Sequence, residues 1–213
     1  LVGGVDSLCL TTLYGFASLQ LTSATPCRPY DAARNGISIG EGAAFALLER
    51  VQEALTGGAL LLLGVGESSD AYHMSSPHPD GLGARMAMTA ALSSARLRPD
   101  DIDYVNLHGT ATPANDAAEG KAVAAVFGDR VPCSSTKGAT GHTLGAAGAV
   151  EAVVCALALS NDLVPGGVNT QSLDPDIPVD YLLKSRSGRL RRALSNSFGF
   201  GGSNCSLILE VAR

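Results

Sequence analysis

The stretch IDYVNLHGT at residues 102–110 joins a short apolar segment to a polar turn that contains a glycine. Pro113 follows, a residue favoured at the first position of a helix, and residues 114–126 have the alanine-rich composition of a helix. Strand, turn and helix in this order form the repeating unit of an α/β fold. The sequence therefore predicts an α/β protein with His108 at the C-terminal end of a strand, where open α/β sheets bind ligands.

The same alternation extends outward in both directions. The expected strands are 42–48, 60–65, 102–107, 131–134, 193–197 and 206–211, and the expected helices are 83–95, 114–126 and 144–160. The first strand is expected to be buried, with a charged helix starting at Glu49-Arg50. The pair Gly57-Gly58 predicts a break between two units, residues 1–56 and 57–213.

Three glycine-flanked motifs carry the chemically capable side chains. They are NLHGT at 106–110, KGATGH at 137–142 and NSFGFGG at 196–202. Two histidines and a lysine are suited to stabilising negative charge on a carbonyl oxygen, and glycine lets the backbone approach a ligand closely. None of the three motifs contains a convincing nucleophile.

Composition excludes several classes of function. A net charge of −5 argues against a general nucleic-acid binder. His73 and His78 have no partners at ligand spacing, so no metal site is expected. The longest apolar run, 59–65, is too short to span a membrane. The five cysteines form no C-x-x-C pair, which predicts free thiols in a reducing, cytoplasmic setting.

In order and spacing, the three motifs resemble those of the β-ketoacyl-[acyl-carrier-protein] synthases, the condensing enzymes of fatty-acid and polyketide assembly. RPYD at 28–31, GEGA at 40–43 and SDAYHM at 69–74 add to the resemblance. It runs from Leu1 to the C-terminus and matches the C-terminal part of that family. The absence of an initiator methionine agrees with a chain that begins inside a longer protein.

The resemblance implies a thiolase-like fold, in which two α/β halves with mixed sheets form a five-layered αβαβα sandwich. Residues 1–56 would finish the N-terminal half, and 57–213 would form the C-terminal half. It also implies a decarboxylative Claisen condensation, in which a malonyl thioester loses carbon dioxide and attacks an acyl group held on a cysteine. That cysteine would lie upstream of Leu1. The chain alone is therefore expected to be inactive and to expose a broad apolar face.

By this resemblance, His108 and His142 are a catalytic pair whose ring N–H groups hold the malonyl thioester oxygen as it becomes an enolate. The task requires neutral imidazoles, which suits an ordinary pKa near 6.5 in a partly dry site.

Lys137 resembles an active-site lysine that pairs with a glutamate, matched here by Glu151. Asp116 and Glu119 match acids on the helix after His108. A lysine buried among these carboxylates would stay charged and support the site electrostatically, without transferring a proton itself.

Phe200 resembles a gating phenylalanine whose backbone N–H joins that of the cysteine in an oxyanion hole. Ser75 and Ser76 fall in a nearby mobile loop. The residues expected along the pantetheine arm and the acyl chain are Thr110, Thr112, Ser75, Ser76, Phe198 and Phe16. No cofactor is expected beyond the phosphopantetheine that arrives on the acyl carrier protein. The implied partners are that carrier, the N-terminal half and a second copy of the full-length enzyme.

Two other functions remain open. One is a non-catalytic partner subunit of the chain-length-factor kind, which usually lacks the active-site histidines. The other is a thiolase, with Cys205 in the neighbourhood of a second catalytic cysteine. Cys133, in a run that superficially resembles a nucleophile motif, is expected to be a buried core thiol. The arginines at 186, 189, 191 and 192 form either a solvated face or part of a carrier-binding surface.

Overall fold

The computed structural model describes residues 1–51 and 57–213. Its largest element is a six-stranded sheet with the order β3-β10-β9-β4-β5-β7. These strands are β3 (Leu60–Ser69), β4 (Tyr104–Asn106), β5 (Pro132–Ser134), β7 (Asp180–Tyr181), β9 (Arg192–Gly199) and β10 (Ser203–Val211). Strands β3, β10 and β9 are antiparallel, whereas β9, β4, β5 and β7 are parallel. The sheet is therefore mixed, as expected.

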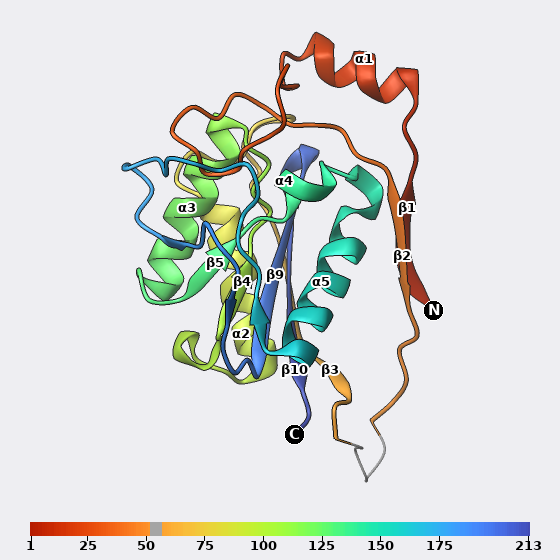
Figure 1. The fold of residues 1–213 in the computed structure, drawn as a ribbon, viewed down its shortest axis with the longest axis vertical. Coiled ribbons are helices and arrows are strands. Elements are labelled where there is room, and N and C mark those ends of the chain that lie inside the picture. The colour runs from red at the N-terminus through yellow and green to blue at the C-terminus, as the bar shows by residue number, and fades with distance from the viewer. Residues whose placement is uncertain (52–56) are drawn as a thin grey trace.

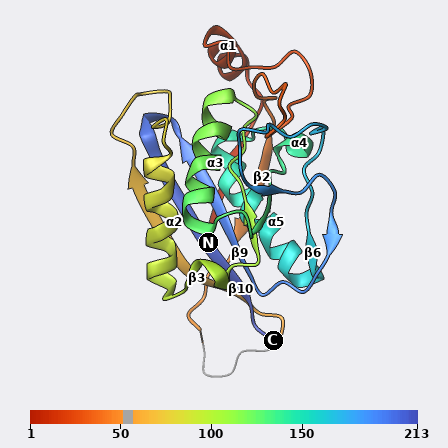
Figure 2. The ribbon, with the colours of Figure 1, turned by 90° about the vertical axis from the view of Figure 1, so that its left-hand side faces the viewer.

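Helices cover both faces of this sheet (Figures 1 and 2). Helices α2 (Leu82–Ala95) and α3 (Pro113–Phe127) lie on one face, and α5 (Ala147–Asn161) lies on the other. A two-stranded ribbon of β1 (Val2–Asp6) and β2 (Gly42–Ala46) contacts the outer side of α5. The order helix, sheet, helix, strand ribbon confirms the α/β class and gives four successive layers of an αβαβα arrangement.

The remaining elements are short. Helix α1 (Leu10–Ser18) lies between β1 and β2 in the chain, at the top of Figure 1. Helix α4 is Lys137–Thr140, and β6 (Leu163–Val164) pairs with β8 (Arg186–Ser187). Three 3-10 turns span Pro99–Asp101, Leu144–Ala146 and Phe200–Gly202.

Small residues allow α2 to approach β3 closely. Gly66 and Gly64 of β3 face the α2 backbone, and a β-carbon at Gly66 would collide with the carbonyl oxygen of Ala87. Ala87 and Ala91 are fully buried on the facing side of the helix. An alanine-rich helix on a glycine-containing strand thus packs without side chains between the two backbones.

The core has two parts, one on each face of the sheet. Met88 of α2 and Val123 of α3 pack with Leu194 and Ile208 on the first face. On the second face, α5 contributes an apolar cluster around Leu159. Both β4 and the first half of β9 are largely buried, and β9 carries polar residues such as Ser195 and Asn196 inside the core.

Three expected elements differ from the structure. The strand at 42–48 is shorter and is not buried, since Phe45 is 58% exposed. Residues 47–51 have no regular secondary structure, so no helix begins at Glu49-Arg50, and residues 52–56 lie outside the described part. The helix at 144–160 begins as a 3-10 turn before α5. The expected boundary at Gly57-Gly58 stays a prediction.

One helical stretch, Leu144–Asn161, is long and apolar enough to cross a membrane, with a mean hydropathy of 1.6 over 18 residues. A helix at 144–160 was expected here, but uninterrupted apolar runs do not reveal its high mean hydropathy, because glycine, alanine and Glu151 are interspersed. The stretch packs between the sheet and the ribbon. Its composition alone is weak support for a membrane span, because core helices pass the same test.

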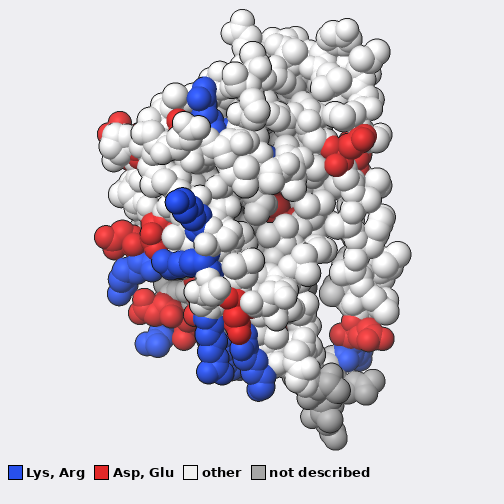
Figure 3. All heavy atoms as spheres, viewed as in Figure 1, with Lys and Arg blue, Asp and Glu red and all other residues white. Residues whose placement is uncertain are grey.

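Charged side chains gather in the lower left of Figure 3, whereas the side formed by α1, β1 and β2 carries few of them. Large apolar residues are exposed on this side and on neighbouring elements. They include Leu1, Val2, Val5, Leu10, Tyr14, Phe45, Leu47, Val153 and Leu157. The broad apolar face expected of this chain is present.

Candidate active site

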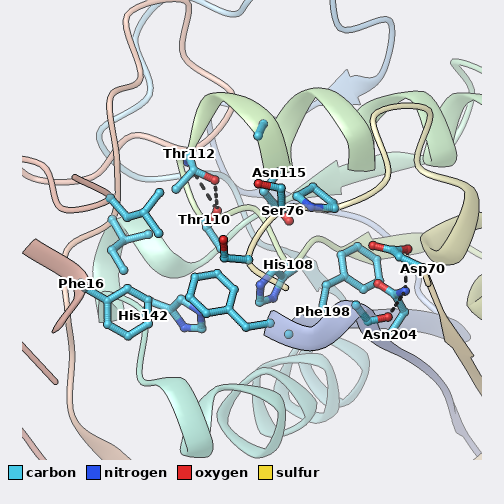
Figure 4. A pocket seen from close by; sticks show the side chains of 18 of the residues that line it. Phe16, Asp70, Ser76, His108, Thr110, Thr112, Asn115, His142, Phe198 and Asn204 are labelled. Carbon is cyan, nitrogen blue, oxygen red and sulfur yellow. Dashed lines mark hydrogen bonds between the residues drawn. The ribbon is translucent and has the colours of Figure 1, made fainter. Parts of the chain in front are cut away.

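A cavity of about 500 Å³ opens at the C-terminal edge of the parallel strands (Figure 4). It brings together segments that are far apart in the sequence, from α1 to the turn between β9 and β10. Its lining includes most of the expected site residues, namely His108, His142, Thr110, Thr112, Ser75, Ser76, Phe198, Phe16 and Phe200. A second hollow, of about 490 Å³, shares both histidines with the first.

His108 follows β4, and its backbone is held on both sides. The N–H groups of His108 and Gly109 each donate to the Glu119 carboxylate at 2.8 Å. Gly109 has φ +39°, and a β-carbon there would collide with Ser135. Glycine is therefore needed for the turn that presents the imidazole to the cavity.

Lys137 holds His108 from its carbonyl side. Its buried ammonium donates to the carbonyl oxygen of His108 at 2.6 Å and lies 3.4 Å from His108 Nδ1. The ammonium also forms an ion pair with Glu151 of α5, whose side chain is 3% exposed. The expected lysine–glutamate pair is therefore present, and it contacts His108 directly.

Both imidazoles have a donor at Nδ1. The backbone N–H of Leu144 lies 3.3 Å from His142 Nδ1, and the Lys137 ammonium faces His108 Nδ1. A neutral imidazole that accepts at Nδ1 carries its proton on Nε2, so we assign the Nε2–H form to both rings. The ring centroids are 5.2 Å apart, with an angle of 82° between planes. Two ring N–H donors thus serve one cavity.

The neutral state has a different cause from the one expected. Burial, with the Lys137 charge next, lowers the pKa of His142 to about 3. Burial, followed by the charge of Lys137, also holds the pKa of His108 well below its usual value. An ordinary pKa near 6.5 is therefore wrong for this site, although the conclusion that both rings are neutral at pH 7 stands.

The two acids of α3 are buried, but they do not surround the lysine. Among the described residues, Glu151 is the carboxylate that pairs with Lys137. Asp116 accepts instead from the backbone N–H groups of Tyr30 at 2.8 Å and Ala111 at 3.2 Å. Glu119 holds the His108 turn. The expected lysine among several carboxylates is corrected to one ion pair and two carboxylates that bind backbone.

The aromatic residues form two contacts in the cavity. Phe200 stacks on Phe16 of α1 with centroids 5.6 Å apart, and Phe198 lies 5.5 Å from the His108 ring. Phe200 begins the 3-10 turn between β9 and β10 and is 51% exposed. Gly201 and Gly202, with φ +84° and +80°, give this turn a backbone that other residues rarely adopt.

Hydroxyl groups lie along the wall of the cavity toward α3. The Thr110 and Thr112 hydroxyls are 2.9 Å apart and border the same cavity as Ser75 and Ser76. Figure 4 shows Thr110, Thr112 and Ser76 on one side of His108, with Phe16 and His142 on another. The cavity therefore has a hydroxyl-bearing wall and an apolar wall.

No cysteine lines the larger cavity in the part of the chain that the structure describes. Cys133 of β5 is fully buried, and burial raises the pKa of its thiol well above the usual value, as expected for a core thiol. Cys205 lines the second hollow, where partial burial also raises its thiol pKa. Within residues 1–51 and 57–213, no group of three or more His, Cys, Asp or Glu side chains could hold a metal ion.

Sequence reasoning assigned no role to several residues of the site. Asn204 donates to Asp70 and to the carbonyl of Gly202, each at 3.0 Å, and thereby holds the turn that carries Phe200. Asn196 contacts Glu119 from β9 at 3.1 Å. The available signal was that Asn196 opens the third motif as a polar residue in a core strand.

The arginine cluster lies away from the cavity. Arg192 starts β9, the strand whose other end reaches the Phe200 turn, and both Arg191 and Arg192 pair with Glu210. This placement favours the solvated face over a surface at the cavity mouth.

Two family profiles match the chain. The profile described as beta-ketoacyl synthase, C-terminal domain, covers residues 60–171, and that of the N-terminal domain covers 1–54. Among curated proteins, the 3-oxoacyl-[acyl-carrier-protein] synthase 2 of Synechocystis is 39% identical over 98% of this chain and 53% of its own length. The mitochondrial 3-oxoacyl-[acyl-carrier-protein] synthase of Arabidopsis thaliana is 46% identical over 85% of this chain and 41% of its own length.

Solved structures of ketosynthases also match the chain. One chain of the solved complex between the ketosynthase ApeO and its chain length factor ApeC, from Xenorhabdus doucetiae, aligns with a TM-score of 0.91 and 46% identity, over 99% of this chain and 52% of the matched chain. A beta-ketoacyl synthase of Burkholderia phymatum aligns with a TM-score of 0.87 and 34% identity, over 100% of this chain and 54% of the matched chain. The chain spans about half the length of the relatives it matches.

Proposed function

The chain belongs to the β-ketoacyl synthase family, and from this premise we propose that it supplies the decarboxylating half of a condensing site. One observation carries the proposal. His108 and His142 are neutral, face one cavity and each have Nδ1 occupied by a donor, which leaves two Nε2–H groups for a substrate oxygen. Residues 57–213 would form the C-terminal half of the enzyme, and residues 1–56 would complete the N-terminal half.

The two N–H groups suit the chemistry of a malonyl thioester. The bond between C2 and the carboxylate breaks, carbon dioxide leaves, and the electron pair forms an enolate whose oxygen accepts from both rings. C2 then attacks the carbonyl carbon of the acyl group on a cysteine outside this chain, and the thiolate leaves. Removing one such donor from a preorganised site costs about 2.7–4 kcal/mol of barrier.

Lys137 acts through His108. Its ammonium donates to Nδ1, which fixes the ring proton on Nε2, and its pairing with Glu151 keeps the lysine charge compensated in a buried site. Phe200, exposed on a turn rich in glycine, would move away from Phe16 to admit the acyl chain.

The substrates and partners follow from the same premise. The hydroxyl-bearing wall, with Thr110 and Thr112, suits the phosphopantetheine arm of an acyl carrier protein, and the apolar wall suits an acyl chain. That arm would arrive with the carrier, so the protein would need no resident cofactor. The full-length enzyme would be a homodimer. The five free cysteines of this chain suit a reducing, cytoplasmic setting.

A second candidate function is a non-catalytic partner of a ketosynthase. The complex of ApeO with its chain length factor shows that such pairs exist among the structural relatives. The presence of both histidines and the lysine in one site favours the catalytic subunit.

The test is a condensation assay with the full-length protein, using acyl and malonyl carrier proteins. We expect 3-oxoacyl product and carbon dioxide from the full-length protein, and no product from residues 1–213 alone. A full-length protein that is inactive by itself but raises the activity of an added ketosynthase would support the partner function. Product from residues 1–213 alone would contradict the proposed division of the site.

A further inference from the structure

The carboxamide of Asn196 is fully buried in β9 and has a partner at each end. Its Nδ2 donates to Glu119 Oε1 at 3.1 Å and lies 3.5 Å from the Met88 sulfur. Its Oδ1 accepts from the Ser206 hydroxyl at 2.7 Å. Because a carboxylate can only accept and the amide nitrogen can only donate, these contacts define the orientation of the amide.

The contacts form one continuous chain of hydrogen bonds to His108. Ser206 donates to Asn196, Asn196 donates to Glu119, and Glu119 accepts from the N–H groups of His108 and Gly109 at 2.8 Å each. Glu119 Oε1 thus has two donors and Oε2 has one. Two of the three donors belong to the His108 turn itself, and the third, Asn196, comes from β9 and so links Glu119 of α3 to a further strand.

The same hydrogen-bonded chain connects the phenylalanine turn and the His108 turn, the two parts of the proposed site. Asn196 faces Ser206 across the β9–β10 ladder, and β9 continues to Phe198 and to the turn that begins with Phe200. The His108 turn, by contrast, follows β4, the neighbour of β9 on its other side. Asn196 is therefore the side chain that ties the strand of the phenylalanine turn to the carboxylate beneath His108.

We propose that Asn196 is a positioning residue for decarboxylation, which holds the Glu119 carboxylate against the His108 turn so that the imidazole N–H meets the enolate oxygen. This inference rests on the proposed function. Asn196 acts through Glu119 and His108 and does not itself line the cavity.

The surroundings of Glu119 explain why one neutral donor matters. Asp116 of α3 carries a like charge, and the neighbouring Tyr30 and Cys133 supply no positive charge. The Lys137 ammonium is directed at Glu151 and at the carbonyl side of His108. The ionised carboxylate therefore depends on three N–H donors against burial, which raises the pKa of Glu119 to about 7.

Two substitutions separate positioning from folding. Asn196→Ala removes the donor, whereas Asn196→Asp keeps the shape. When the introduced carboxyl and Glu119 share one proton, the new carboxyl can donate to Glu119 as the amide does. When both groups ionise, two like charges face each other and the hydrogen bond from residue 196 to Glu119 is lost. Asn161→Ala is the matched control, because Asn161 is exposed at the end of α5 and its side chain donates to the Leu157 carbonyl of the same helix.

The experiment measures two partial reactions of the full-length enzyme: carbon dioxide release from malonyl carrier protein, and transfer of an acyl group to the enzyme. For Asn196→Ala we expect release to slow by roughly 10- to 100-fold, the scale of a misplaced catalytic group. Acyl transfer should stay within about twofold of the wild type, because it does not use the histidine pair. Asn161→Ala should change neither rate.

The pH profile supplies the second readout. Asn196→Asp should retain carbon dioxide release at acidic pH and lose it as the pH rises, over a range in which the wild-type rate does not fall. Equal losses in both partial reactions, or an Asn196→Asp profile parallel to the wild type, would overturn the inference. A wild-type enzyme that releases no carbon dioxide would overturn the proposed function as well, so the two failures are distinguishable. If Asn196→Ala does not fold, the Asn196→Asp profile alone decides.

Discussion

The two histidines of the site owe their chemistry to their neighbours. Their positions follow from the glycine motifs in the sequence, but their protonation does not, because it depends on burial and on a lysine from another segment. The sequence also placed Glu119 on the correct helix. Its contact with Asn196 depends on how β9 packs against α3, which no local pattern encodes. The Lys137–Glu151 pair was expected from the family resemblance, whereas the contacts of Glu119 and Asp116 with residues from other segments were not.

Acid should destabilise the protein through His142. The folded pKa is about 3, below the ordinary value of 6.5, so between these values the unfolded chain binds a proton that the folded chain does not. Stability should therefore fall as the pH is lowered from about 6.5 to 3, by at most about 1.4 kcal/mol per pH unit from this group.

The check is chemical denaturation of the full-length wild type and of His142→Asn between pH 7 and 4. The variant lacks the titrating group, so its free energy of unfolding should fall less steeply with acid than that of the wild type. Parallel pH dependences for the two proteins would contradict a neutral, buried His142.

At the scale of elements, strands and helices were predictable where packing is internal to this chain. The expected strands at 60–65 and 102–107 and the expected helices at 83–95 and 114–126 overlap β3, β4, α2 and α3. β2 was misjudged because its apolar composition suggests burial, whereas its side chains are largely exposed in this chain. Apolar character shows that a surface requires a partner without showing which chain supplies it.

The packing of α2 on β3 makes a prediction at Gly66. Gly66→Val should destabilise the protein by about 1–3 kcal/mol or more, because the side chain would collide with backbone atoms of Ala87 and Ala91, which cannot move independently of the helix. Gly15→Ala in α1 is the matched control. Its β-carbon meets no atom within 4 Å, and alanine favours a helix by about 1 kcal/mol. Denaturation midpoints should move in opposite directions, and equal shifts would contradict the close contact.

For the whole molecule, the exposed apolar face and the lack of a cysteine in the lining of the larger cavity, among the described residues, both fit a chain that matches about half of its relatives' length. The chain matches about half the length of its relatives, and many of its exposed apolar residues lie on the ribbon, α1 and α5. The larger cavity contains two N–H donors and an aromatic turn, and its lining includes no cysteine among the described residues. The central claim is that this half performs decarboxylation, while the cysteine that carries the acyl group lies in the other half.

The most direct test measures carbon dioxide release from malonyl carrier protein by the full-length enzyme after its nucleophilic cysteine has been alkylated. Release should continue, because the enolate is held by His108 and His142, and it should fall roughly 100-fold or more in His108→Ala or His142→Ala. Condensation should be absent in all of these samples. Carbon dioxide release that both histidine variants retain at the rate of the alkylated wild type would contradict the account.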